Sequence, residues 1–260
     1  MNRLGRLFIL LVTGSLLALA TIWTIQLWGI ISSHPSGPGV DLHQYQGHVD
    51  RWLATGQFYL PRQLAGPTAV MDGDPLYPPI ALYLLLPFRW LPEILWWAPP
   101  LAILGYALLR FRPRMWTWPL LAAIVAYPRT EAMIFYGNPG MWIDAAIAAG
   151  LLWAWPAAFV LIKPSLGPFA LIGIRHRSWW IAVGLIVLAA IPFGSLWVDY
   201  LTVLQNSRVP LTYSVLDLPL ALGPVIAWLG RRDPRVGIAP PWEGLVDRAQ
   251  PALTLITRRA

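Results

Sequence analysis

Segment 39–52, GVDLHQYQGHVDRW, holds two aspartates, two histidines and a tyrosine directly behind the first long apolar run of the chain. A carboxylate can take the proton of a hydroxyl group, while tyrosine and histidine can hydrogen-bond a polar ligand. In a helix, Asp41, Tyr45 and His48 would share one face at spacing i, i+4 and i+7, whereas Asp50 would lie on another. The segment is therefore expected to present one carboxylate among polar neighbours.

Two other interpretations of this segment stay open at the level of sequence. Asp41 could cap the helix that follows the GPGVD loop, a role worth about 1 kcal/mol that involves no chemistry. Aspartate and histidine also bind metals, but their split over two helix faces and the absence of a motif such as HExxH argue against a metal site. We expect no bound metal and no cofactor.

The composition indicates a membrane protein. The 260 residues are 57% hydrophobic and 12% charged, include 16 Trp and 26 Pro, and have a mean hydropathy of +0.56, unlike a soluble domain. The N-terminus carries Arg3 and Arg6 ahead of an apolar core of about 25 residues, which reaches the length of a membrane span. No small-residue cleavage site follows, so we expect a retained first span.

Seven further apolar runs follow the first span, near 78–91, 94–109, 116–127, 141–155, 157–174, 179–196 and 214–229. Several are shorter than the ~20 residues of a straight span and contain proline, which predicts kinked or half-embedded helices around a polar groove. The expected fold is an all-α, polytopic transmembrane bundle of about eight segments. Residues 1–229 would form the membrane domain and 230–260 a cytoplasmic polar tail.

Arginine clusters predict the orientation, because basic loops remain in the cytoplasm. If the eight runs each cross once, the N-terminus and the arginines at 175–177 and 231–235 are cytoplasmic, and 32–77 is a long extracytoplasmic loop. The RFRPR cluster at 110–114 then falls on the outer side. Either a short apolar run lies in the interface without crossing, or the rule is locally broken.

Charge and cysteine content exclude other classes of protein. The net charge of +7 comes from short basic clusters between apolar runs, not from a basic surface with stacking aromatics, so nucleic-acid binding is not expected. The chain has no cysteine, which excludes a disulfide framework, a thiolate metal site and a cysteine nucleophile.

Four segments carry a resemblance: VDLHQYQGHVDRWLATGQFY, DPLYPPIALYLLLPFRWLP, FYGNPGMWIDAAIAAGLLW and AAFVLIKPSLGPFALIGIRHRSWW. In order and spacing they resemble landmarks of glycosyltransferase family 87, membrane proteins of the GT-C superfamily. The matching positions are Asp41 and Tyr45, Gly56 and Tyr59, Tyr77 to Pro79, Gly137 and Asn138, and Lys163 and Pro164. The family usually has glutamine where Asn138 stands, and its chains usually continue through several more spans.

The resemblance implies transfer of a hexose, typically mannose, from a polyprenyl-phosphate donor to a lipid or glycan acceptor at the extracytoplasmic face of the cell membrane. It implies an inverting reaction without metal or cofactor, with a second subunit as the source of further spans. Asp41 would be the catalytic base. The expected substrate contacts are Tyr45, His48, Asn138, Lys163 and Arg208.

Lys163 is the only lysine of the chain, and its position in an apolar run makes it a candidate for the donor phosphate. If that run descends from the outer face at residue 157, the lysine lies about 9 Å deep at 1.5 Å per residue. The alternative is an interface lysine that anchors the helix end by snorkelling. Arg208, in the last outer loop, is a second candidate for the phosphate.

Two rival functions remain. The chain could be a non-catalytic, shortened relative that binds a polyprenyl lipid or scaffolds a membrane partner. Intramembrane charges and broken helices also occur in transporters, but no paired symmetrical half is visible here.

Overall fold

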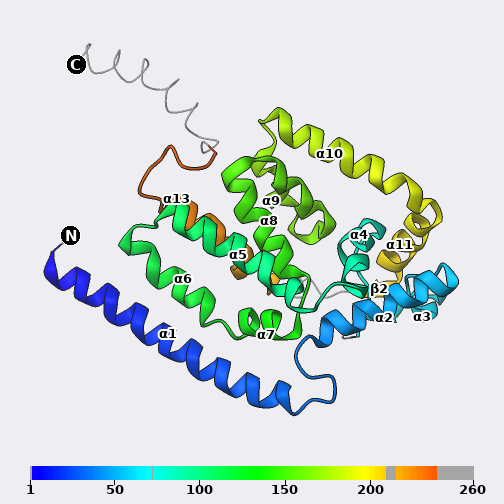
Figure 1. Ribbon diagram of the computed structural model, residues 1–260, viewed down its shortest axis with the longest axis horizontal. Helices are drawn as coiled ribbons and strands as arrows, with labels where there is room; N and C mark the ends of the chain where they lie inside the picture. Colours follow the sequence, from blue (N-terminus) through cyan, green and yellow to red (C-terminus); the bar gives the residue numbers. More distant parts are fainter. Residues whose placement is uncertain (1, 72, 209–214, 239–260) are drawn as a thin grey trace.

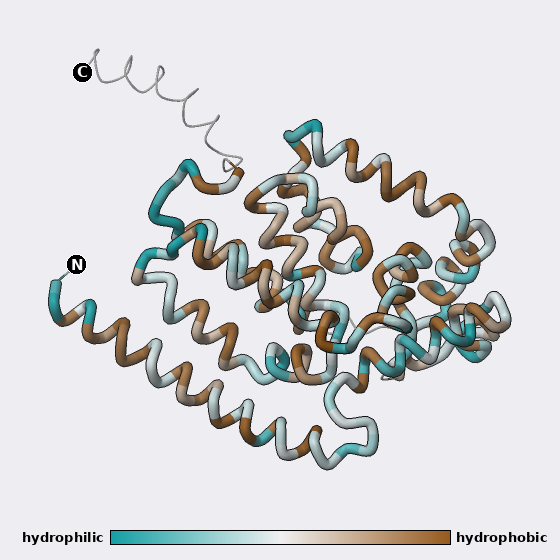
Figure 2. The backbone as a smooth tube through the Cα atoms, viewed as in Figure 1, coloured by the Kyte–Doolittle hydropathy of each residue, from teal (hydrophilic) through white to brown (hydrophobic). Residues whose placement is uncertain are grey.

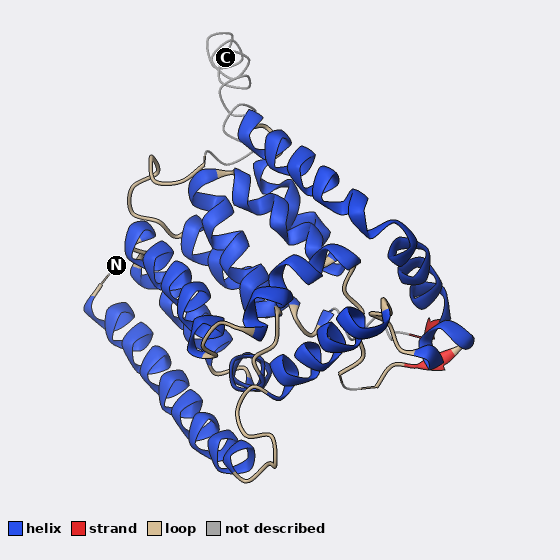
Figure 3. Ribbon diagram, turned by 45° about the vertical axis from the view of Figure 1, so that its right-hand side comes forward, coloured by secondary structure: helices blue, strands red, loops and turns tan. Residues whose placement is uncertain are grey.

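The computed structural model describes residues 2–71, 73–208 and 215–238. This part of the chain is mostly helical, with connecting loops and one parallel pair of short strands, β1 (Thr68–Ala69) and β2 (Ser207–Arg208) (Figure 3). The all-α class expected from the sequence therefore describes the architecture. Of the expected polar tail, residues 239–260 lie outside the described residues.

Three helical segments of the described chain are long and apolar enough to cross a membrane: α1 (Arg3–Ser32), α5 (Ile94–Phe111) and the run formed by α10 (Arg177–Ala190), η7 (Ile191–Phe193) and α11 (Gly194–Asn206). Shorter apolar segments are η1 (Pro79–Ala81) with α4 (Leu82–Leu85) and η2 (Leu86–Arg89), η3 (Met115–Thr117) with α6 (Trp118–Val125), α8 (Gly140–Trp153) and α13 (Leu218–Leu229). These segments indicate a membrane protein, and three of the about eight expected segments reach the length of a straight span.

The outer helices turn apolar side chains away from the protein. On α1, Leu11 and Ile25 are exposed, and on α10 the same holds for Ile181 and Leu188. Figure 2 shows brown, hydrophobic stretches along both helices. Such continuous exposed apolar surface suits contact with lipid.

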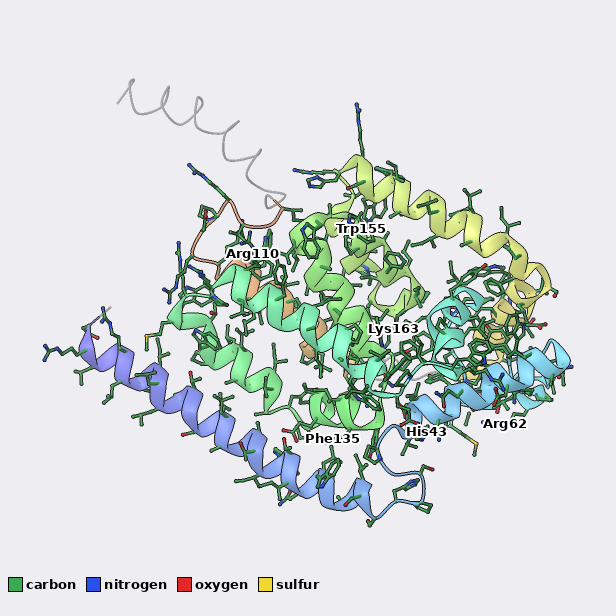
Figure 4. All side chains as sticks on the ribbon, in the orientation of Figure 1. His43, Arg62, Arg110, Phe135, Trp155 and Lys163 are labelled. Carbon is green, nitrogen blue, oxygen red and sulfur yellow. The ribbon has the colours of Figure 1, made fainter. Side chains whose placement is uncertain are left out.

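The run 157–174 is not a span, which corrects one expectation. It consists of the short pieces η4 (Trp155–Ile162), η5 (Pro164–Leu166), α9 (Gly167–Ala170) and η6 (Leu171–Gly173). A Cβ added to Gly173 would lie 2.4 Å from the carbonyl oxygen of Ala154, so the two ends of the run touch. We call residues 154–173 the hairpin; Lys163 lies at its tip, far from Trp155 (Figure 4).

Prolines explain why this run folds back. Proline lacks the N–H of a regular helix and pushes the preceding residue out of the helical region. Lys163, which precedes Pro164, accordingly has φ −121° and ψ 85°. Ala154 adopts φ 66°, where a side chain is disfavoured, and makes the sharp turn after α8.

The arginine clusters lie at one end of the molecule, which we call the arginine end. The amide of Arg114 donates to the carbonyl of Gly230 at 2.7 Å, and the amide of Arg232 donates to that of Phe111 at 3.2 Å. The N-terminus lies at this end as well (Figure 1). The arginines concerned are Arg3, Arg6, Arg110, Arg112, Arg114, Arg175, Arg177, Arg231, Arg232 and Arg235.

This arrangement corrects the expected separation of the clusters. Cluster 110–114 lies beside 230–235, not on the opposite side. Six helical segments of the described chain connect the arginine end with the opposite end: α1, α5, η3 with α6, α8, α10 with α11, and α13. Figure 4 shows the separation, with Arg110 near one end and His43 and Arg62 at the other.

Two glycines let the start of α2 (Val40–Thr55) approach the end of α7 (Pro128–Tyr136). The amide of Gly39 donates to the carbonyl of Phe135 at 2.9 Å. Gly137 ends α7 at φ 69°, and a Cβ there would lie 3.3 Å from the Cα of Gly39 and 3.2 Å from the ring of Trp97. The backbones can therefore come this close only because neither residue carries a side chain.

Replacing Gly137 by alanine tests this contact. We expect Gly137→Ala to lower the free energy of unfolding by about 1–2 kcal/mol, because an L-residue at positive φ is strained and its Cβ lacks room. Thermal unfolding in detergent measures the change. The control is Gly184→Ala in α10, where open space surrounds the glycine and alanine favours the helix. Equal melting temperatures for the two variants would contradict the expectation.

Candidate functional site

A cavity of about 540 Å³ lies at the end opposite the arginine end, and its size is that of a ligand pocket. We call it the polar cavity. The end of α1, the first turns of α2, the loop before Asp74, and α7 enclose it. Its polar lining includes Asp41, Gln44, Tyr45, Arg129, Asn138 and Asp217.

Asp41 lies in the first turn of α2 and faces the polar cavity. The N-cap of α2 is Gly39, and no side chain caps this helix, so the capping interpretation of Asp41 is wrong. Instead, Nδ2 of Asn138 donates to Oδ2 of Asp41 at 2.6 Å. The expected carboxylate is therefore placed where a ligand can reach it.

The side-chain amide of Asn138 is oriented by two hydrogen bonds, one made by its oxygen and one by its NH₂ group. Its Oδ1 accepts from the backbone N–H of Gly140 at 2.8 Å, at the start of α8. The NH₂ group therefore has to point toward Asp41, and a hydrogen-bond donor held there stabilises the charged carboxylate. Asn138, expected from the sequence as a substrate contact, is placed to position the carboxylate of Asp41.

Tyr45 and Gln44 continue the lining along α2. Tyr45 is 5% exposed, and its ring lies edge-on to Tyr77 with centroids 5.5 Å apart. The Oε1 atom of Gln44 is buried and has no hydrogen-bond partner among the described residues. A buried acceptor in a cavity wall is a position where a ligand donor would be favoured.

His48 lies behind the wall of the polar cavity and does not line it. Its Nε2–H donates to the carbonyl of Gly73 at 2.7 Å, and its Nδ1 accepts from Nη2 of Arg51 at 2.9 Å. Asp74, which follows Gly73 in the chain, forms an ion pair with Arg62 and accepts a hydrogen bond from the backbone N–H of Met71. The wall of the cavity at this point consists of Met71, Gly73 and Asp74. His48 stabilises this wall through its hydrogen bond to Gly73, whereas the sequence predicted that it contacts the substrate.

Lys163 reaches the site from the tip of the hairpin. Its Nζ donates to Oδ2 of Asp217 at 2.7 Å, and Nε of Arg129 donates to Oδ1 of the same carboxylate at 2.7 Å. Arg129 and Asp217 line the polar cavity, whereas Lys163 stands behind Asp217. Lys163 is therefore connected to the polar cavity by its ion pair with Asp217.

Arg208 and Asp50 lie away from the polar cavity. Arg208 is exposed in β2, opposite Ala69, and the residues that follow it, 209–214, lie outside the described residues. Asp50 is exposed and pairs with Arg89 of η2. The structure thus brings together Asp41, Tyr45 and Asn138, and separates them from Arg208.

Arg129 and Asp217 were missed by the sequence analysis. Each is a charged residue beside an apolar run, in YPRTEAM and SVLDLPLAL, and that placement was the available signal. Their contact spans 88 positions of the chain, so local spacing carries no information about it.

A second cavity, of about 270 Å³, adjoins the polar one, and Met133 contributes to the walls of both. We call it the apolar cavity, because leucine, alanine and other apolar side chains of α1, α5, α6, α8 and α13 form nearly all of its lining. Asp144 of α8, which is 7% exposed, is the one carboxylate in this lining among the described residues. The two cavities together have a polar and an apolar part.

Among the described residues, no group of three or more histidine, aspartate or glutamate side chains is arranged to hold a metal ion. The carboxylates of the polar cavity instead face amide, guanidinium and ammonium groups. We assign no metal site to this cavity.

His48 predicts a dependence of stability on pH. Burial lowers the pKa of His48, and the charge of Arg51 acts in the same direction, whereas the Gly73 hydrogen bond and Asp74 raise it. The unfolded chain titrates near 6.5 and binds more protons below that pH, so the free energy of unfolding falls as the pH drops below about 6.5.

We expect His48→Gln to flatten this acid-side loss, because the glutamine amide can replace both hydrogen bonds without titrating. Thermal unfolding in detergent at a series of pH values from about 5 to 7 measures it. The control is His176→Gln, at an exposed histidine of the arginine end. A His48→Gln variant with the full pH dependence of the parent would show that another group causes it.

Comparisons of the chain with protein-family models, with curated proteins and with solved structures gave no match. The residues of the two cavities and the motifs of the sequence are therefore the basis for a functional proposal.

Proposed function

We propose that the protein is a membrane glycosyltransferase that moves a hexose from a polyprenyl-phosphate donor to a hydroxyl acceptor. One observation carries this proposal: Asp41, oriented by Asn138, lines the same cavity as the guanidinium-bearing Arg129. Transfer from a sugar phosphate requires a base for the acceptor and a cation for the phosphate. The resemblance to glycosyltransferase family 87 supports the same reaction.

In this reaction the carboxylate of Asp41 takes the proton of the acceptor hydroxyl. The acceptor oxygen bonds to the anomeric carbon while the bond from that carbon to the phosphate oxygen breaks. The phosphate leaves with the electron pair, and positive charge develops on the sugar ring between the two events. Mannose is the sugar and inversion the stereochemistry that the resemblance favours.

Arg129 takes the role of phosphate contact in this proposal. It lines the polar cavity, and a planar guanidinium matches phosphate oxygens in two-point hydrogen bonds. Lys163 acts through Asp217, which it shares with Arg129. Tyr45 and Gln44 line the same cavity, where their side chains would contact sugar hydroxyls.

The apolar cavity supports a lipid-linked donor. A polyprenyl phosphate has a charged head and a long hydrocarbon chain, and the two adjoining cavities match these parts. The cavity is lined by α1, α5 and α13, helices that also expose apolar side chains such as Leu11, Leu109 and Leu222. A substrate that remains in the bilayer would reach the site between such helices.

Binding without catalysis is the second candidate function. The observation that favours it is the pairing of Asp217 with both Lys163 and Arg129. These two cations already form ion pairs with the carboxylate, so a donor phosphate would have to compete with it. A lipid-binding or scaffolding protein needs no base at Asp41. Loss of the Asp41 carboxylate would therefore reduce the activity of a transferase but would leave the function of a binding protein intact.

The arrangement of the arginines supports a multi-pass orientation in the cell membrane. With the arginine end in the cytoplasm, all four clusters obey the positive-inside rule and both termini of the described chain lie inside. The six segments that connect the two ends then cross, while η1 to η2 and the hairpin do not. The polar cavity opens toward the extracytoplasmic side.

Asp41→Asn tests the catalytic role. Base catalysis contributes typically 10² to 10⁴-fold, so we expect a loss of transfer of about that size. Asparagine can still accept the hydrogen bond of Asn138, so the melting temperature should stay close to that of the parent. The measurement is transfer from radiolabelled polyprenyl-phosphate mannose by the purified protein in detergent.

The matched control is Asp50→Asn, at a carboxylate outside the polar cavity. It should lose far less activity than Asp41→Asn. Near-parental transfer by Asp41→Asn, or no transfer by the parent with any lipid-linked sugar, would favour the binding function.

Single cysteines test the orientation, since the chain has none of its own. In intact cells a membrane-impermeant thiol reagent should label Ser36→Cys and should label neither Arg114→Cys nor Asp233→Cys, all at exposed positions. All three should react after the membrane is permeabilised. Labelling of Arg114→Cys in intact cells would contradict the shared cytoplasmic end.

A further inference from the structure

A third cavity, of about 330 Å³, lies at the arginine end between the returning arm of the hairpin and α13. We call it the interface cavity. Apolar side chains line most of it, including Leu171 from η6 and Val225 and Leu229 from α13. Arg175 and His176 complete the lining, and both are exposed at the edge of the fold.

The surroundings of the interface cavity are strongly positive. The arginine end holds ten arginines of the described chain, and Asp233 is the one acid among its described residues. α10 starts at this edge with His176 as its N-cap, and no side chain caps its first N–H groups. A helix N-terminus favours an anion, and here it adjoins a guanidinium and an apolar hollow.

We propose that the interface cavity binds an anionic phospholipid of the cytoplasmic leaflet. An acyl chain occupies the apolar part, and the phosphate meets Arg175, His176 and the start of α10. The positive charge of the arginine end favours an anionic lipid over a neutral one, and anionic lipids are concentrated in the cytoplasmic leaflet. The proposal rests on the orientation argued above and is independent of glycosyl transfer.

The position of the lipid connects it with the polar cavity. The interface cavity is formed by the arm of the hairpin and by α13, and the far ends of these two elements carry Lys163 and Asp217. A ligand that contacts both elements stabilises their packing, because it binds the folded arrangement alone. The lipid would thereby hold the hairpin in the position at which Lys163 reaches Asp217.

Reconstitution tests the proposal. The full chain is placed in nanodiscs of phosphatidylcholine alone or with phosphatidylglycerol, and its thermal unfolding is followed. With the anionic lipid in large excess over its dissociation constant, we expect the melting temperature to rise by about 5–10 °C. Arg175→Gln should remove most of this rise, whereas Arg110→Gln, the matched loss of an arginine outside the cavity, should keep it.

Two further measurements distinguish a lipid bound in the cavity from a free anion and from a general attraction of the positive surface to an anionic membrane. Leu229→Trp, which fills the cavity without changing the charge, should also remove the rise. Inorganic phosphate added to phosphatidylcholine nanodiscs should give no rise. The proposal is overturned by a parent that does not respond to phosphatidylglycerol, by an equal loss in Arg110→Gln, or by a rise with phosphate alone.

Discussion

The ion pair between Lys163 and Asp217 is the contact on which the arrangement of the site depends. Lys163 is 8% exposed and Asp217 4%, and leaving one partner of such a pair alone costs several kcal/mol. The tip of the hairpin, the start of α13 and, through Arg129, helix α7 are therefore fixed relative to one another. α7 in turn positions Gly137 and Asn138, which carry the contact to Asp41.

Local periodicity was sufficient to predict α2 and the face that bears Asp41 and Tyr45, because both depend on helix geometry alone. It was insufficient for His48, which shares that face but is covered by the loop at Gly73. A residue two turns along a helix meets whatever the rest of the chain places beside it. That contact spans 25 positions and has no local signature.

Apolar length was a poor guide where proline is frequent. The run 157–174 is hydrophobic enough for a span, yet Pro164 and Pro168 divide it into short pieces that return to the end from which they came. The conflict over the arginines at 110–114 had the same origin, because counting the segment at 79–89 as a crossing inverted the side expected for this cluster. Counting the hairpin as another crossing then cancelled the inversion for the arginines at 175–177. The positive-inside rule alone would have grouped the four clusters on one side, and the structure places them at one end of the molecule.

The solitary lysine has a physical explanation that requires no contact with ligand. Lys163 and Arg129 donate to different oxygens of the Asp217 carboxylate, so two cationic side chains hold this buried acid. Placed behind Asp217, the lysine compensates the charge of this carboxylate in a poorly solvated region, while Arg129 keeps its position in the cavity wall.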